Sequence, residues 1–182
     1  PADDLVTKLI NAEVEGDKLS ESEFDMFALL LTVAGNETTR NATAHGMKAL
    51  MDHPDQLARL QDDPSPEAIA TAVEEILRWA MPVLHFRRTA MADYELRGKQ
   101  IKAGDKVVMW HISANRDEEV FDEPFRFDVT RSPNDHIAFG GGVHRCLGSH
   151  LARLELRIAL REWHRRIPDY AVTGQYEPEW LE

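Results

Sequence analysis

The sequence contains very little cysteine: Cys146 is the only one among 182 residues. A lone cysteine excludes a disulfide within the chain, and it excludes zinc or iron–sulfur sites that need several cysteines. Three roles remain open for it, namely a buried inert thiol, a nucleophile, or a single thiolate ligand to a metal ion. The residues around Cys146 therefore decide which chemistry the chain can support.

The sequence also lacks long hydrophobic runs and an excess of basic residues. Its longest apolar run, residues 27–34, includes Thr32 and is shorter than the ~18 residues that a membrane-spanning helix needs. No leader or lipid-attachment motif is recognised, so we expect a cytoplasmic protein with no membrane partner. The net charge of −11 argues against nucleic acid as a partner, because nucleic-acid binding needs a basic surface.

Glycine and positive charge surround Cys146. Three consecutive glycines, residues 140–142, precede it and allow the backbone to approach a bulky group closely. His144 and Arg145 place positive charge beside the sulfur, and a patterned helix begins near Leu147, so both the charges and the helix dipole favour a thiolate. A glycine-rich loop that presents a thiolate in this way could hold a soft or redox-active iron.

Residues 139–148 resemble the haem-thiolate loop of the cytochrome P-450 family, whose pattern is F-G-x-G-x-H-x-C-x-G. The six matching positions are Phe139, Gly140, Gly142, His144, Cys146 and Gly148. The resemblance implies a bound haem b, with Cys146 as the axial ligand of its iron and His144 in contact with a propionate. A cysteine hydrolase is the weaker alternative, because no general base has motif support.

A long helix is predicted over residues 21–52. Ser20 and Glu23 have the spacing of a capping box at its start, and a histidine–proline pair ends it. Residues 24–34 are apolar almost all round, which predicts a segment buried on every side. Residues 35–39 are polar and lie in mid-helix, so by themselves they indicate either a kink or a place where the helix emerges into solvent.

The stretch Ala34-Gly35-Asn36-Glu37-Thr38-Thr39 is similar to the oxygen-binding groove of the same family, A-G-x-[D/E]-T-T. The resemblance implies that Gly35 leaves room for dioxygen and that Thr38 donates a hydrogen bond to it. Glu37 with Thr38 would relay protons, since general acid catalysis needs positioned groups of this kind.

A second strong helix is predicted to open at Ser65 or Pro66. It carries Glu75 and Arg78, three residues apart on one face. If the pair is exposed, it is a surface salt bridge that contributes little to stability. The pair is also similar to the E-x-x-R motif of the family, which is buried and structural. There the third member comes from a P-x-R-F motif, and residues 124–127 match it, which implies a triad of Glu75, Arg78 and Arg126.

Residues 83–86 are predicted to form a strand after this helix. In the family this stretch passes beside the haem, which implies a substrate pocket lined by Val83, Leu84 and His85 together with Ala34. Arg88 matches a residue that pairs with a haem propionate, for which a guanidinium is well suited; a solvated arginine is the alternative. Residues 94–96 and 106–110, with a turn at Gly98, predict further strands of a small sheet, and residues 113–117 open a short helix.

The last helix is predicted from about Leu147 to Ile167. Arginines recur at every fourth position in it and form a band with Arg145: Arg153, Arg157, Arg161 and Arg165. In the family this side of the haem docks an electron donor, so the band implies a ferredoxin-type partner steered by charge. The alternative is that the arginines pair with Glu155 and Glu162 or are buried.

We therefore expect a mainly α fold with a small β-sheet, the C-terminal half of the P-450 fold. Residues 1–182 would be a single partial domain, without the N-terminal half and the last strands. The implied function is a haem-thiolate monooxygenase that inserts one oxygen of O₂ into a hydrophobic substrate. Residues 34–41 and 113–119 resemble actinobacterial enzymes that hydroxylate sterols and methyl-branched lipids. The final Leu181-Glu182 pair is either native or a cloning remnant.

An inactive fragment is the second hypothesis. Without a covering partner, residues 24–34 would be exposed, and an exposed apolar patch promotes association. Such a chain would be haem-free, or would bind haem without turnover, and would form homo-oligomers that exchange the long helix between copies.

Overall fold

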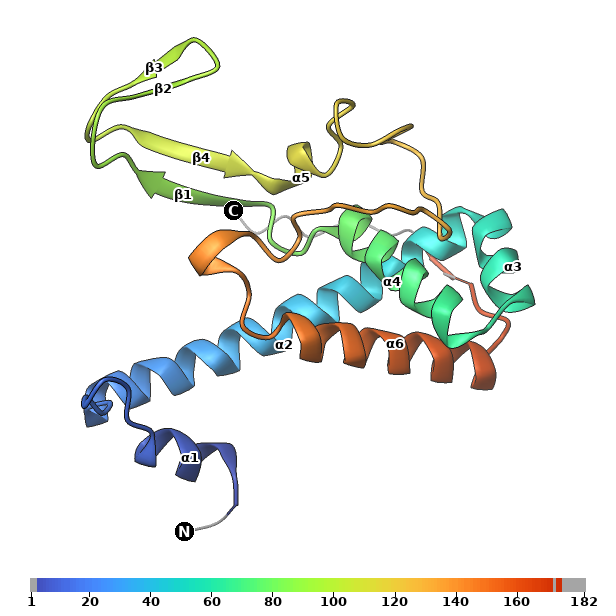
Figure 1. Cartoon of the computed structure of the whole chain (residues 1–182). Helices are drawn as coiled ribbons and strands as arrows, with labels where there is room; N and C mark the ends of the chain where they lie inside the picture. Colours follow the sequence, from blue (N-terminus) through green and yellow to red (C-terminus); the bar gives the residue numbers. More distant parts are fainter. Residues whose placement is uncertain (1–2, 172, 175–182) are drawn as a thin grey trace. The chain divides into compact units, whose positions relative to one another are not determined.

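The computed structural model describes residues 3–171 and 173–174, so the pair Leu181-Glu182 lies outside the described residues. The chain divides into two units, one up to Thr38 and one from Thr39 onward. Both units are mainly helical, and the strands belong to the second (Figure 1). The expected mainly α fold with a small amount of sheet is confirmed.

The first unit contains helix α1 (Leu5–Asn11) and the first part of helix α2 (Glu21–Asp52). The predicted capping box forms at the start of α2: the Ser20 amide donates to Glu23 Oε2 at 2.9 Å, and the Glu23 amide donates to Ser20 Oγ at 3.3 Å. The predicted burial of residues 24–34 on every side is not seen in this chain. Four apolar side chains of the segment are 58–63% exposed: Met26, Leu29, Leu30 and Val33.

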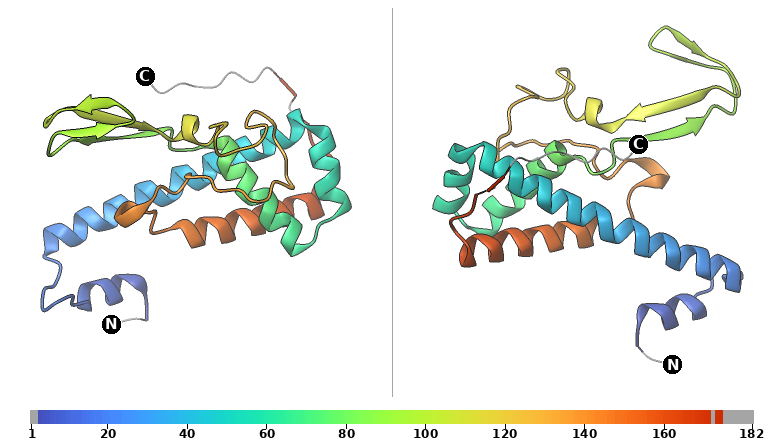
Figure 2. Two further views of the ribbon diagram at one scale, coloured as in Figure 1. Left: turned by 45° about the horizontal axis from the view of Figure 1, so that its top comes forward. Right: turned by 180° about the vertical axis from the view of Figure 1, so that it is seen from behind.

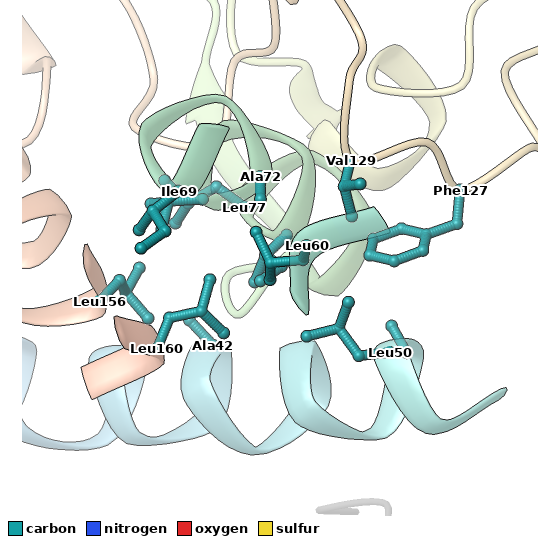
Figure 3. Close-up of a cluster of buried hydrophobic side chains, with 13 residues drawn as sticks. Ala42, Leu50, Leu60, Ile69, Ala72, Leu77, Phe127, Val129, Leu156 and Leu160 are labelled. Atoms are coloured by element: carbon teal, nitrogen blue, oxygen red, sulfur yellow. The ribbon is translucent and has the colours of Figure 1, made fainter. Parts of the chain in front are cut away.

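The second unit is built on a core of helices. The second part of α2 packs with α3 (Pro54–Asp62), α4 (Pro66–Ala80) and α6 (Ser149–Arg166) around buried aliphatic side chains (Figure 3). Gly46 of α2 lies so close to α4 that a Cβ there would stand 2.5 Å from Ile76 Cγ2. The absence of a side chain at Gly46 thus lets the Ile76 side chain of α4 pack directly against the α2 backbone.

Helix α4 begins where its sequence predicts. Ser65 Oγ accepts a hydrogen bond from the Ala68 amide at 3.2 Å, and proline occupies the first turn. The helix ends at Ala80, and the next residue, Met81, has a φ of +41° that turns the chain out of the helix. The buried side chains of α4 point into the core, and α6 packs against this helix (Figure 1).

The strands form two separate two-stranded ladders instead of one small sheet. Strand β1 (His85–Thr89) pairs antiparallel with β4 (Lys106–Trp110), and β2 (Tyr94–Leu96) pairs with β3 (Lys99–Ile101) (Figure 2). The β2–β3 hairpin pairs only within itself, because backbone bonds between Ala90 and the 104–105 turn close the β1–β4 ladder before it. Val83 and Leu84, expected in the strand, precede it.

After β4 the chain forms the short helix α5 (His111–Ala114), which begins two residues before the expected position. Residues 115–141 contain neither helix nor strand, and a single 3-10 turn (Gly142–His144) follows. Helix α6 then starts at Ser149, three residues beyond Cys146. Within the part of the chain that the structure describes, no helix is long and apolar enough to cross a membrane.

Candidate functional site

The loop that carries Cys146 is closed by backbone hydrogen bonds. The Cys146 amide donates to the Phe139 carbonyl at 2.9 Å, and the Gly140 amide donates to the Ile137 carbonyl at 2.8 Å. Gly140 and Gly142 have φ values of +67° and +62°, a region that glycine adopts without steric cost. The two glycines therefore allow the tight path that brings Cys146 back beside Phe139.

The thiol of Cys146 is free and exposed. Gly148 lies beside it, since a Cβ there would be 3.9 Å from the sulfur, while a Cβ on Gly141 would meet nothing within 4 Å. Two solvent-exposed apolar residues flank Cys146 in the sequence: Val143 is 97% exposed and Leu147 is 76% exposed. A thiolate amid bare apolar side chains fits a flat, largely apolar cofactor with a soft or redox-active metal, and haem has that chemistry.

Exposed apolar side chains continue from the loop onto α6. Leu151 and Leu154 are 60% and 54% exposed, and Ile158 one turn further is 44% exposed. With Leu147 their spacing follows one face of a helix. This face is open in the structure, and the cysteine loop lies at its N-terminal end.

Arg88 and His144, the two expected propionate partners, are both exposed. Arg88 Nη1 donates only to the neighbouring carbonyl of Arg87 at 3.0 Å, and its guanidinium lies 5.6 Å from the ring centroid of Phe86. Neither side chain is held by a carboxylate in the described residues. Both are therefore available to an anionic group.

His111 of α5 lies beside Phe86 of β1, and no pattern in the sequence points to it. It is 5% exposed, its ring lies 5.6 Å from that of Phe86, and its Nδ1 atom has no hydrogen-bond partner among the described residues. Burial lowers the pKa of His111, and the charges of Arg88 and His85 lower it further. His85 itself stacks on Trp110 at 4.7 Å.

Glu75 and Arg78 form a buried bidentate ion pair. Arg78 Nε donates to Glu75 Oε2 at 2.7 Å and Nη2 donates to Oε1 at 2.8 Å, and both side chains are fully buried. The exposed surface pair, left open from the sequence, is therefore excluded. The carboxylate also accepts hydrogen bonds from the Asp128 amide at 2.9 Å and from Asn134 Nδ2 at 3.1 Å.

The expected third member of this triad, Arg126, is wrong as a side-chain partner. Its side chain is 50% exposed and pairs with Glu123 at 2.7 Å, because a turn bonds the Arg126 amide to the Glu123 carbonyl and directs the side chain away. Only its backbone carbonyl takes part, accepting from Arg78 Nη2 at 3.0 Å. The second guanidinium beside Glu75 belongs to Arg131, whose Nε lies 3.2 Å from Glu75 Oε2.

The expected oxygen groove, residues 34–39, lies within helix α2. Thr38 Oγ1 donates to the Ala34 carbonyl at 2.7 Å, and a Cβ on Gly35 would meet nothing within 4 Å. These residues, with Glu37, belong to the first unit and Cys146 to the second. The structure thus describes the two parts of the predicted site separately.

Most arginines of the band on α6 form ion pairs with carboxylates, and only some of these partners are the expected ones. Arg161 and Arg165 pair with Glu162 at 3.4 and 2.8 Å, as expected for one alternative. Arg153, by contrast, pairs with a carboxylate of α4 that the sequence did not suggest, Glu74, at 2.8 Å. Arg157 lies 3.8 Å from the same carboxylate.

Comparison with known proteins identifies relatives of the whole described region. The sequence model of the family Cytochrome P450 matches residues 68–163. The chain is 53% identical over 174 residues to the methyl-branched lipid omega-hydroxylase of Mycobacterium tuberculosis, covering 95% of this chain and 40% of that protein. It is 52% identical over 170 residues to the steroid C26-monooxygenase of the same organism, covering 93% of this chain and 38% of that protein.

Solved structures agree in fold. The Mycobacterium marinum cytochrome P450 CYP268A2 in complex with pseudoionone has a TM-score of 0.88 and 54% identity, covering 93% of this chain and 41% of that one. CYP109E1 from Bacillus megaterium in complex with testosterone has a TM-score of 0.92 and 40% identity, covering 98% of this chain and 50% of that one. The chain spans about 40% of the length of the curated relatives it matches.

Proposed function

Because this chain belongs to the cytochrome P450 family, we propose that it is the haem-binding part of a single monooxygenase domain. The observation that carries the proposal is the cysteine loop. Its positive-φ glycines and the bond from the Cys146 amide to the Phe139 carbonyl present a free, exposed thiol among bare apolar side chains. A thiol displayed in this way is unusual for a structural cysteine, which is normally buried.

Each site residue has a definite role in the proposed reaction. Cys146, as a thiolate, would bind the iron of a haem b, and Arg88 and His144 would bind the propionates by charge-assisted hydrogen bonds. When bound, the haem supplies the activation of O₂ and the insertion of one oxygen atom into a C–H bond. Thr38 would hold a proton at Oγ1, and Glu37 would replenish it from solvent, while Gly35 leaves space beside them.

A hydrophobic substrate of the sterol or methyl-branched lipid class fits the names of the two mycobacterial relatives. The pocket would be lined by Val83 and Leu84, which precede β1, by His85, which begins it, and by Ala34 on α2. None of these four side chains belongs to the buried core, which leaves them free to contact a substrate. The exposed arginines of α6, which include Arg161 and Arg165 at 54% and 62%, would dock an acidic ferredoxin-type electron donor.

Self-association without turnover is the second candidate for this chain. The exposed side chains of Met26, Leu29, Leu30 and Val33 favour it, because apolar patches of this kind promote association. Exchange of the long helix between copies would cover them.

One preparation of the 182-residue chain tests both candidates. Haem is added, and the absorption spectrum of the reduced, carbon-monoxide-bound sample is recorded together with the mass from light scattering. A red-shifted Soret band of the thiolate type, lost in Cys146→Ser and after alkylation of the thiol, supports the proposal. A sample that binds no haem and has a multiple of the 20.7 kDa monomer mass supports self-association instead. A thiolate-type band that persists in Cys146→Ser would refute the role of Cys146.

A further inference from the structure

A cluster of charged side chains surrounds Glu74 on α4, the neighbour of the buried Glu75. Arg153 of α6 holds its carboxylate by a bidentate pair, with Nε 2.8 Å from Oε1 and Nη2 2.8 Å from Oε2. His136, from the segment that leads into the cysteine loop, places Nε2 at 3.0 Å from Glu74 Oε2. Three segments far apart in the sequence therefore meet at one carboxylate.

The hydrogen bonds of His136 define its tautomer. Nδ1 accepts from the Ala138 amide at 3.2 Å, so the ring hydrogen is on Nε2, from which it is donated to Glu74. The side chain is only 2% exposed. The ring thus ties the backbone at residue 138 to α4, one residue before the cysteine loop begins.

Arg153 reaches the cysteine loop through Phe139. Its guanidinium lies 4.5 Å from the centroid of the Phe139 ring, which is a cation–π contact. The carbonyl of Phe139 accepts the hydrogen bond from the Cys146 amide. A continuous series of contacts therefore runs from Glu74 through Arg153 and Phe139 to Cys146.

The carboxylate of Glu74, with which this series of contacts begins, is held ionised. Burial raises the pKa of Glu74, but the hydrogen bonds of His136 and Arg153, together with the charge of Arg153, outweigh burial and bring its pKa to about 2. At neutral pH Arg153 therefore has a permanent charged partner. That partner fixes the plane of the guanidinium over the Phe139 ring, because a bidentate pair restricts orientation as well as distance.

We propose that Glu74 and Arg153 are positioning residues for the haem-thiolate loop, which they hold through Phe139 so that Cys146 meets the iron. The proposal rests on the proposed function for its last clause, and on the contacts of this chain for the rest. It differs from the docking role expected of the arginine band, because Arg153 is directed inward, with 19% of its side chain exposed, whereas Arg165 is 62% exposed.

Amide hydrogen exchange on the haem-free 182-residue chain tests the positioning without any haem. Arg153→Ala is compared with Arg165→Ala, an arginine of the same helix that pairs with Glu162 at the surface. In Arg153→Ala we expect peptides covering residues 137–147 to exchange about tenfold faster, equivalent to about 1.4 kcal/mol. In Arg165→Ala they should be unchanged. In Arg153→Ala, peptides covering α4 should accelerate less than the loop peptides, since a loop can open without the core.

Two milder variants keep the test decisive if Arg153→Ala does not fold. Glu74→Gln preserves shape but removes the charge that orients Arg153, and Arg153→Lys keeps a cation but loses the planar fork. Both should accelerate exchange in the loop, with Arg153→Lys the smaller effect. If exchange accelerates equally in α4, α6 and the loop, the contacts affect only the stability of the whole fold, and the proposal is overturned. Unchanged exchange in the loop would overturn it as well.

The haem-loaded chain gives the second readout. Arg153→Ala should shift the reduced, carbon-monoxide-bound spectrum from the thiolate-type band toward the band of neutral ligation, while Arg165→Ala retains the wild-type spectrum. An unaltered spectrum in Arg153→Ala contradicts the positioning of Cys146. If the wild-type chain itself forms no thiolate-type band, the proposed function fails for this chain, and the exchange experiment still decides whether Glu74 and Arg153 hold the loop.

Discussion

Arg78 makes five hydrogen bonds from a side chain that is fully buried, and its replacement by methionine should be among the most damaging single changes in the chain. Two bonds go to Glu75, at 2.7 and 2.8 Å. The other three go to the backbone carbonyls of Asn115, Pro124 and Arg126, at 2.9, 2.8 and 3.0 Å. The guanidinium thus joins α4 to the irregular segment between α5 and the cysteine loop.

The cost of Arg78→Met follows from the groups it leaves behind. A buried carboxylate that loses its partner costs about 3–5 kcal/mol. Glu75 retains Arg131 at 3.2 Å and two hydrogen bonds, so the lower end of that range applies. Each orphaned buried carbonyl adds about 1–3 kcal/mol, which brings the total above about 5 kcal/mol. A loss of that size equals the whole stability of many domains, about 5–15 kcal/mol.

Urea denaturation followed by circular dichroism measures this loss. Arg97→Met is the matched control, because Arg97 pairs with Glu119 at 2.7 Å while 78% of its side chain is exposed. We expect no resolvable change in the control, and an Arg78→Met chain that is unfolded or nearly so. If Arg78→Met loses less than about 2 kcal/mol, the carbonyls and the carboxylate must find other partners, and the reasoning from buried groups is refuted.

Two further predictions concern Glu74 and Thr38. The folded pKa of Glu74 is about 2 against an ordinary 4.5, so its stabilisation is fully present above pH 4.5 and is lost as the pH falls toward 2. In denaturation series at pH 7, the free energy of unfolding of the wild type should exceed that of Glu74→Gln by at most about 3 kcal/mol. A difference between the two that does not narrow on acidification would contradict this prediction. For Thr38, the chain is placed in a chimera that replaces the matching segment of the steroid C26-monooxygenase of Mycobacterium tuberculosis. Thr38→Ala should release more peroxide per electron consumed, whereas Thr38→Ser should stay coupled; equal coupling in all three proteins would remove the proposed proton role.

Local signals in the sequence predicted the helices closely. The limits of α2 were predicted at Glu21 and Asp52, because a capping box and a proline act within one turn of the residues they affect. The start of α4 at Ser65 or Pro66 is likewise predicted from local residues, and the helix begins at Pro66 with Ser65 as its N-cap. The contact of Glu75 with Arg78 was available from spacing, since residues three apart share a helix face. Its burial followed from the family motif alone.

The errors lie where the answer depends on contacts between distant segments. Arg126 matched a motif, but a turn at Glu123 directs its side chain outward, and Arg131 occupies the place beside Glu75. The pairing of Glu74 with Arg153 joins residues 79 apart, and no periodicity in either helix indicates it. The division of the strands into two ladders likewise depends on which partner each edge finds, which composition does not determine.

The two consecutive carboxylates of α4 explain how one turn of helix can organise the second unit. Neighbouring residues on a helix point about 100° apart, so Glu74 and Glu75 face different segments. Glu75 with Arg78 fixes the irregular segment through its backbone carbonyls, and Glu74 with Arg153 fixes α6 and the start of the cysteine loop. The loop is thereby attached to α4 by a second set of contacts, independent of the Glu75–Arg78 pair. It follows that loss of the Glu74 contacts should loosen the cysteine loop while the Glu75–Arg78 contacts persist, whereas loss of Arg78 should affect both.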